Sequence, residues 1–154
     1  MLVRSLPEVE SWTFCEQIRT ERTAGITRCF ALAKAMTVRE AARTFGLANR
    51  MATYRGIQRA EADIIACQLL QTSLAYRTTL MAAARASQLW EEFLKLFSGQ
   101  ALQFATNLGE VSGRFDLQSA VAFSFSPATS ATFDLGVIVL GTSNTGCLWV
   151  EEED

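Results

Sequence analysis

The sequence predicts an α+β protein whose helices come first in the chain and whose strands come last. Apolar residues recur at helical spacing through most of residues 8–97, and the two prolines, Pro7 and Pro127, leave that stretch uninterrupted. After Gly109 apolar and polar residues alternate, as they do in strands with one buried face. Helices and strands that are segregated along the chain are typical of the α+β class. We expect three regions: a basic helical region (1–56), a long helical region (57–109) and a β meander with an acidic tail (110–154).

The first helical stretch covers residues 8–36, and Gly25 allows a break within it. Its apolar positions at helical spacing are Val9, Trp12, Cys15, Ile18, Ile26, Phe30 and Ala33. We therefore expect N-terminal helices up to about residue 36.

The clearest local motif is TVREAARTFGLANRMATYR, which begins at Thr37. Thr37 and Glu40 predict a capping box, in which the threonine hydroxyl accepts from the Glu40 amide and the glutamate side chain accepts from the Thr37 amide. A helix should begin at Val38, and Gly46 should end it because glycine adopts the left-handed C′ conformation at little cost. A second helix is expected after this glycine, from Ala48. The segment is then a helix-turn-helix-like corner, which serves either to contact DNA or only to pack two helices.

Charge is distributed unevenly, although the formal net charge is only −2. Residues 1–60 hold ten basic and five acidic side chains, whereas residues 61–154 hold four basic and eleven acidic ones. This asymmetry favours a basic working surface in the N-terminal part, where side chains could contact phosphates and base edges. The candidate nucleic-acid contacts are Arg39, Arg43, Asn49, Arg50, Thr53, Arg55 and Arg59. The alternative is that the arginines solvate helices or pair with carboxylates of the other half of the chain.

Residues 57–97 carry an apolar stripe that is too long for one helix of a compact monomer. As a single helix the stretch would span about 60 Å, whereas a globule of this chain length is about 40 Å across. The helix should break near residues 84–87 into a hairpin, or project and bury its stripe against other copies. Both outcomes favour a hairpin or an oligomer over a plain monomer, and we expect a homo-oligomer. The expected interface residues are Ile65, Leu69, Tyr76, Leu80 and Trp90.

Three antiparallel strands are expected near the C-terminus, at residues 115–125, 131–140 and 147–152, with turns between them. A three-stranded meander has two edges, and its apolar run at residues 137–140 would pair readily if it were exposed. The edges must be covered by helices or paired with another chain. Protein partners are therefore expected through a β edge.

The sequence holds no pattern of catalytic or metal-binding residues. Histidine is absent, which excludes Ser-His-Asp triads, Cys-His dyads and histidine-liganded metals. The four cysteines are far apart and form no C-x-x-C pair, so we expect reduced thiols, no metal and no cofactor. The stretch GTSNTG (141–146) lacks the Lys-Ser/Thr of a phosphate-binding loop and is expected to form a hairpin turn. We expect no enzymatic activity.

The sequence also predicts no contact with a membrane. The charge-free runs at residues 117–133 and 135–150 are rich in Ser, Thr and Gly, whereas a spanning helix needs about 20 mostly apolar residues. The first residues, MLVRSLPEVESW, lack the apolar segment of a signal peptide. A cytoplasmic location is therefore expected.

The layout resembles that of the small subunit of phage terminases. The shared features are a basic helix-turn-helix-like part containing TVREAARTFGLANRMATYR, a central pair of long helices and a short C-terminal β segment. The resemblance implies that the N-terminal unit recognises viral DNA, that the long helices assemble a ring, and that the last strands join it or bear on the motor and portal. By this resemblance Arg50, Thr53 and Arg55 would contact DNA, in the host-cell cytoplasm or the virion.

Two functions are therefore expected. The first is a non-enzymatic, homo-oligomeric assembly protein whose N-terminal helices contact nucleic acid, in a viral DNA-packaging role. The alternative is a purely structural or adaptor protein of a virion or complex, which assembles through long helices and β edges without nucleic acid.

Overall fold

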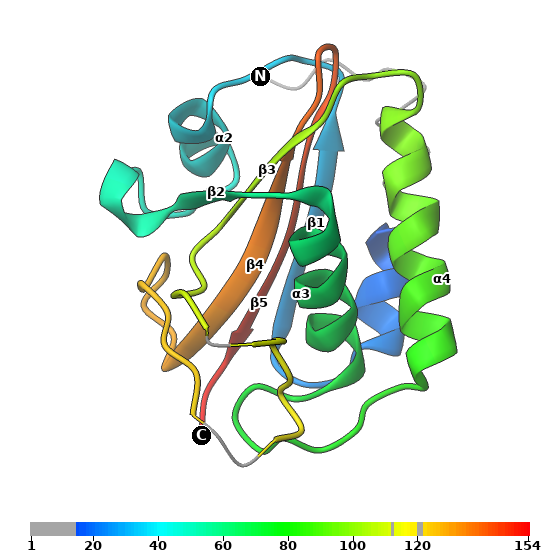
Figure 1. Cartoon of the computed structure of the whole chain (residues 1–154), viewed down its shortest axis with the longest axis vertical. Helices are drawn as coiled ribbons and strands as arrows, with labels where there is room; N and C mark the ends of the chain where they lie inside the picture. Colours follow the sequence, from blue (N-terminus) through cyan, green and yellow to red (C-terminus); the bar gives the residue numbers. More distant parts are fainter. Residues whose placement is uncertain (1–14, 112, 120–121) are drawn as a thin grey trace.

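The computed structural model describes residues 15–111, 113–119 and 122–154, and it confirms the mixed α+β class. Helical residues 15–21 are followed by β1 (Ile26–Leu32), α2 (Val38–Thr44), η1 (Met51–Thr53), β2 (Arg55–Ile57), α3 (Arg59–Gln71), α4 (Ala83–Leu94), η2 (Lys95–Phe97), β3 (Gln103–Thr106), β4 (Phe133–Leu140) and β5 (Thr145–Glu152). The strands form one antiparallel sheet in the order β1-β5-β4-β3-β2 (Figure 1). It includes strands from all three expected regions. Val9 and Trp12 of the predicted first helix lie outside the described residues.

Two cores lie on opposite faces of this sheet. The helices α3 and α4 cover one face, and α2 covers the other (Figure 1). The central strands β4 and β5 are therefore buried on both faces, which suits their nearly continuous apolar sequences.

The hairpin of β4 and β5 was predicted correctly, from residues 131–140 and 147–152. The two strands pair antiparallel over eight residues each. A hydrogen bond from the Gly141 amide to the Asn144 carbonyl (2.8 Å) closes the turn between them. The glycine-rich stretch is thus a hairpin turn, as its position between two strands predicted.

β1 replaces part of the expected N-terminal helix, and the helix prediction was wrong over residues 26–32. The spacing of Ile26 and Phe30 fits a helix, but side-chain burial alternates along the segment as in a strand, and all seven residues pair with β5. Cys29 faces the core beneath α3 and α4, whereas Phe30 lies on the other face and stacks on Phe45 with ring centroids 5.8 Å apart. Pairing with a strand that is distant in sequence decided the structure.

The strand that was expected over residues 115–125 is absent, and that prediction was also wrong. Its described residues form turns and irregular backbone with an isolated bridge. Side chains there provide hydrogen-bond partners for backbone groups. The Arg77 guanidinium donates to the Leu117 carbonyl (3.1 Å), and the Gln68 side-chain oxygen accepts from the Leu117 amide (3.0 Å). The alternating phenylalanines of this segment pack on the core as parts of a loop.

The long helical stretch forms a hairpin, one of the two expected outcomes, but it breaks at residues 72–82 and not at 84–87. α3 ends at Gln71 and α4 begins at Ala83. In the connection the Leu80 amide donates back to the Gln71 carbonyl (2.7 Å). Both helices lie over the sheet (Figure 1). A single copy of the chain thus covers most of its own apolar stripe.

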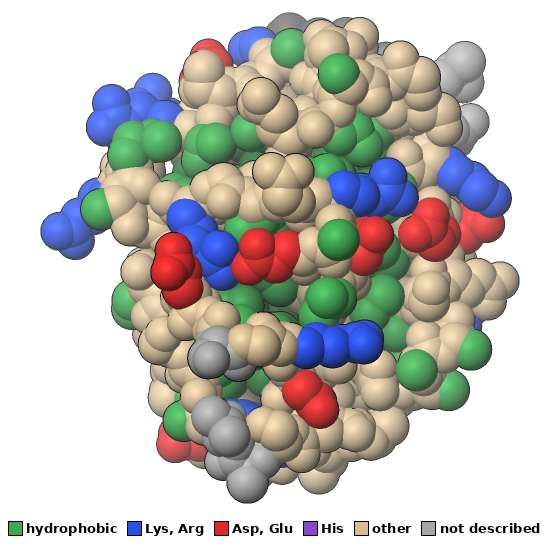
Figure 2. All heavy atoms as spheres, viewed as in Figure 1, with side chains coloured by type: hydrophobic (Ala, Val, Ile, Leu, Met, Phe, Trp, Pro, Cys, Tyr) green, Lys and Arg blue, Asp and Glu red, His purple; other side chains and the backbone are tan. Residues whose placement is uncertain are grey.

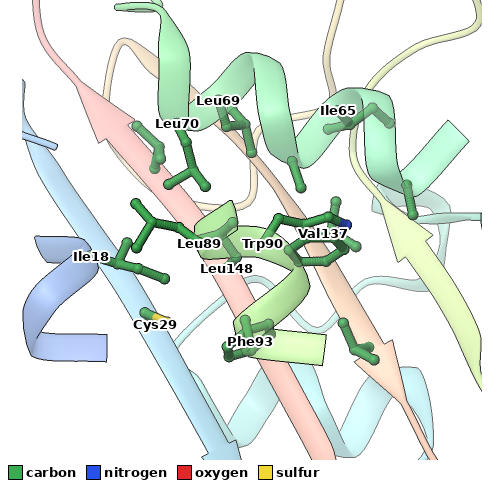
Figure 3. Packing of buried hydrophobic residues seen from close by; sticks show 14 of the residues in the cluster. Ile18, Cys29, Ile65, Leu69, Leu70, Leu89, Trp90, Phe93, Val137 and Leu148 are labelled. Carbon is green, nitrogen blue, oxygen red and sulfur yellow. The ribbon is translucent and has the colours of Figure 1, made fainter. Parts of the chain in front are cut away.

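Five residues were predicted to lie at an interface between copies, and burial contradicts this prediction for three of them. The exposed fraction is 0% for Ile65 and Leu69 and 1% for Trp90, and all three lie in the core between helices and sheet (Figure 3). They cannot contact a second copy in this fold. Tyr76, which is 65% exposed, and Leu80, which is partly exposed, lie in the connection between the helices. The apolar stripe therefore gives no argument for self-assembly.

Candidate nucleic-acid interface

α2 is held at both ends by the local interactions that the sequence predicted. The Glu40 amide donates to the Thr37 hydroxyl (3.1 Å) and the Thr37 amide donates to the Glu40 carboxylate (3.0 Å), so the capping box is confirmed. At the other end Gly46 has φ +77°, and the Leu47 amide donates to the Ala42 carbonyl (2.8 Å), as in a Schellman motif. Side chains on the outer face of α2 therefore project from a fixed backbone.

The second helix of the expected helix-turn-helix is absent, and that prediction was wrong. After Gly46 the chain continues through irregular residues 47–50 into η1 and the strand β2. β2 pairs with β3, and Tyr54 packs edge-on against Trp149 with ring centroids 6.0 Å apart. Sheet pairing and burial of this aromatic ring outweigh the local helical spacing.

α2 packs a face of small residues on the sheet and presents a basic face to solvent. Ala41 and Ala42 are fully buried in the core on this side of the sheet. Arg39 and Arg43 lie one helical turn apart and are exposed. The Arg39 Nε donates to the Asn49 carbonyl (3.4 Å), which links the helix to the loop that follows it.

Four of the seven predicted nucleic-acid contacts are exposed on α2 and the loop after it, and the other three lie elsewhere. The four on α2 and the loop after it are Arg39, Arg43, Asn49 and Arg50, and Arg59 of α3 is also exposed. Thr53 is buried. Arg55 donates to Glu61 (2.8 Å), and Arg59 donates to Asp63 (3.0 Å), so both of these guanidinium groups are held by carboxylates.

Four cations in this part of the molecule form no ion pair with any carboxylate of the described residues. They are Lys34, Arg39, Arg43 and Arg50, which we call the basic surface. The sole carboxylate between residues 33 and 54 is that of Glu40, and the capping box already uses it. Hydrogen bonds from the Thr37 amide and hydroxyl, with the charges of Lys34 and Arg43, hold the pKa of Glu40 below its ordinary value. Positive charge is therefore locally in excess.

The surface view shows the same contrast. Near the middle of the face in Figure 2, Lys and Arg side chains lie beside Asp and Glu side chains. At the left edge, where Figure 1 places α2 and η1, Lys and Arg side chains stand apart from acidic ones. Lys34 was not among the predicted contacts, although it belongs to the basic run between Arg19 and Arg59 that suggested them.

Other chemistry has little support among the described residues. No group of three or more Cys, Asp or Glu side chains in that part of the chain could hold a metal ion. The cysteines are free, and burial raises the pKa of Cys29, Cys67 and Cys147, which keeps these thiols protonated and weakly nucleophilic. Within the described ranges no helix combines the length and apolar character that a membrane crossing requires. The basic surface can instead hold an anion such as a phosphate group.

Comparisons of the chain with protein-family models, with curated proteins and with solved structures find no match. Function must therefore be inferred from the charges, contacts and shape of the chain itself.

Proposed function

We propose that this chain is a non-enzymatic protein that binds nucleic acid through its basic surface. The observation that carries the proposal is that four exposed cations lie on and around α2 without a carboxylate partner in the described residues. Because the whole chain has a net charge of −2, this local excess is not a consequence of overall composition. Guanidinium groups bind phosphate oxygens bidentately, and a polyanion gains affinity by releasing its counterions.

The alternative interpretation, in which arginines serve as structural partners of carboxylates, fits other positions. Arg55 and Arg59 are bonded to carboxylates, and Arg85 donates to Glu21 through two nitrogens. These residues are therefore left out of the proposed interface. A role as structural partners of carboxylates does not explain the four cations of the basic surface.

Replacing Arg39, Arg43 and Arg50 together by alanine is expected to weaken nucleic-acid binding roughly 10- to 100-fold at about 0.1 M salt. Each lost phosphate contact should also reduce the slope of log K against log salt by about 0.9 for a duplex, so the slope should fall by about 2–3. Fluorescence anisotropy with a labelled oligonucleotide, titrated between about 50 and 200 mM salt, measures both quantities.

The matched control is the double variant Arg85→Ala/Lys95→Ala. These two cations lie on α4 and η2, away from the basic surface, and both are already bonded to carboxylates. Their removal should therefore change binding by less than about twofold, because paired surface charges contribute little. A parent protein without salt-sensitive binding, or a triple variant that binds like the parent, contradicts the proposal.

The resemblance to phage terminase small subunits would place this binding in viral DNA packaging, and that role stays a prediction. In this fold η1 and β2 stand where the DNA-reading helix was expected. The expected ring-forming helices, α3 and α4, bury their apolar residues against the chain's own sheet. Self-assembly therefore also stays a prediction, and it would have to use other surfaces.

A second candidate function, a structural or adaptor role without nucleic acid, is favoured by β1. This seven-residue strand stands at the end of the strand order β1-β5-β4-β3-β2. Ile26 is 62% exposed and Phe30 is 39% exposed. A long edge strand with exposed apolar side chains is prone to pair with another chain.

Ile26→Lys tests this second function, because a lysine on an edge strand opposes edge-to-edge pairing. If copies pair through β1, light scattering should show the parent as a dimer or larger and the variant as a monomer. Met51→Lys introduces the same charge at a residue that is 50% exposed on another element, and it should leave the mass unchanged. A parent that is monomeric at every concentration contradicts pairing of copies through this edge.

A further inference from the structure

Gly56 lies in the middle of β2, and no contact within the described residues requires a glycine there. Its φ is not positive, and an added Cβ atom would meet only the Phe104 carbonyl oxygen, at 4.0 Å. By contrast, a Cβ atom at Gly136 would lie 2.3 Å from the Trp149 ring, so packing explains that glycine. Glycine weakens a strand and often marks a site that a ligand or another backbone approaches closely.

Gly56 lines an open groove of about 610 Å³. Gly56 and Ala105 are directly paired across β2 and β3, so they share one face and form a floor of small residues. The apolar part of the wall includes Val38 of α2, Met51 of η1 and Leu140 of β4. On the side of β2 and α3 the groove is lined by Arg55, Glu61 and Arg59, whose charges are engaged in ion pairs. The volume lies within the range of about 300–1,000 Å³ that is typical of small-ligand sites.

Two cations of the basic surface are neighbours in the chain of residues that line this groove. Arg39 follows the wall residue Val38 in the chain, and Arg50 precedes the wall residue Met51. Neither arginine pairs with a carboxylate of the described residues. A ligand in the groove would therefore meet a floor of small residues, apolar side chains and unpaired positive charge on the α2 and η1 side, and arginines already paired with carboxylates on the β2 and α3 side.

The groove also offers hydrogen-bonding groups of both kinds. Gln58 and Gln103 line it, both are exposed, and within the described residues neither side-chain amide makes a hydrogen bond. Each amide carries donors and an acceptor, which is what the pairing edge of a nucleic-acid base requires.

We propose that the groove takes one base of a single-stranded nucleic acid, with the base over Gly56 and Ala105 and the neighbouring phosphates on Arg39 and Arg50. This inference rests on the proposed function and adds the class of ligand to it. A base in a duplex has both faces stacked and its pairing edge occupied, so only an unpaired base can enter. A neutral apolar side chain of a peptide would use the walls but not the flanking cations.

Gly56→Leu tests the inference, because it fills the groove at a position where a side chain has room. Binding of a labelled single strand should weaken about 10-fold, roughly the contribution of one bound base, while binding of the matching duplex and the salt slope stay unchanged. Ala60→Leu adds the same side chain at an exposed position of α3 outside the groove, and it should bind like the parent. Gly56→Val is the second filling variant, and circular dichroism checks that each variant is folded.

The possible results separate this inference from the proposed function. If the parent binds duplex and single strand equally, or if Gly56→Leu and Gly56→Val bind the single strand like the parent, the inference is wrong while nucleic-acid binding stands. A mononucleotide that binds as tightly as the oligonucleotide also overturns it, because the ligand is then a free nucleotide. If no nucleic acid binds with salt dependence, the proposed function itself fails.

Discussion

Glu152→Ala is expected to lower the free energy of unfolding by about 3–5 kcal/mol. Glu152 is 4% exposed, and its Oε2 lies 2.6 Å from the Nη2 of Arg22, which is 1% exposed. Truncating the glutamate leaves the guanidinium buried without a charge partner, which is far more costly than losing a surface ion pair.

The same carboxylate organises the polar groups at one end of the core. It accepts hydrogen bonds from the Ser73 hydroxyl (2.6 Å) and the Leu74 amide (2.8 Å), just after α3. Arg22 in turn donates to the carbonyl of Leu69 in α3. The last residues of β5 are thereby joined to the end of α3 and to the chain before β1, so several partners lose their bonds at once.

Urea unfolding followed by tryptophan fluorescence measures this effect. Glu153→Ala is the matched control, because Glu153 is the next residue, is exposed, and bonds only to Thr132 among the described residues. Its loss should change the free energy of unfolding by less than about 1 kcal/mol. A similarly small loss for Glu152→Ala would show that the buried pair does not hold these elements together.

The pH dependence of stability gives a second measure of the same carboxylate. Burial raises the pKa of Glu152, but hydrogen bonds from Ser73, Arg22 and Leu74 outweigh burial and leave the pKa below its ordinary value. A carboxylate with a lowered pKa stabilises the fold above its unfolded-state pKa of about 4.3, and this contribution is lost as the pH falls through the folded-state pKa. The difference in stability between the parent and Glu152→Gln should therefore shrink below about pH 4.

Sequence reasoning succeeded where the deciding contacts are local. α2 could be predicted because Thr37, Glu40 and Gly46 act on the helix that lies between them. β1 could not, because Ile26 and Phe30 fit both a helix and a strand, and the partner that decides between them is β5, near the far end of the chain. The helix expected over the residues of β2 was wrong for the same reason, since these three residues form a strand only by pairing with β3.

The candidate site was predicted in part. The charge asymmetry pointed to Arg39, Arg43 and Arg50, which are exposed. It also pointed to Arg55 and Arg59, whose carboxylate partners Glu61 and Asp63 lie only six and four residues further along the chain, so these two ion pairs could have been anticipated from the sequence. The groove combines residues of α2, η1, β2, β3 and β4, so no linear motif marks it.

Trp90→Ala is expected to lower the free energy of unfolding by about 3–5 kcal/mol without changing the mass of the particle in solution. Trp90 is 1% exposed and stacks on Phe93, with ring centroids 5.8 Å apart. Its indole N–H donates to the Asp63 carboxylate (2.8 Å), which joins α4 to α3. Truncation therefore opens a cavity in the core and breaks a bond between the two helices (Figure 3). Urea unfolding followed by circular dichroism gives the first quantity, and light scattering gives the second.

Tyr76→Ala is the matched comparison, because the sequence predicted Tyr76 and Trp90 at the same interface but the fold exposes one and buries the other. Tyr76 is 65% exposed, so its truncation should change the free energy of unfolding by no more than about 0.5 kcal/mol. If Trp90→Ala instead costs less than about 1 kcal/mol and dissociates a multimer, then α4 meets another copy of the chain. A large loss for Trp90 with a small one for Tyr76 means that the apolar stripe is the core of a single chain, because a core residue acts through unfolding and an interface residue acts through association.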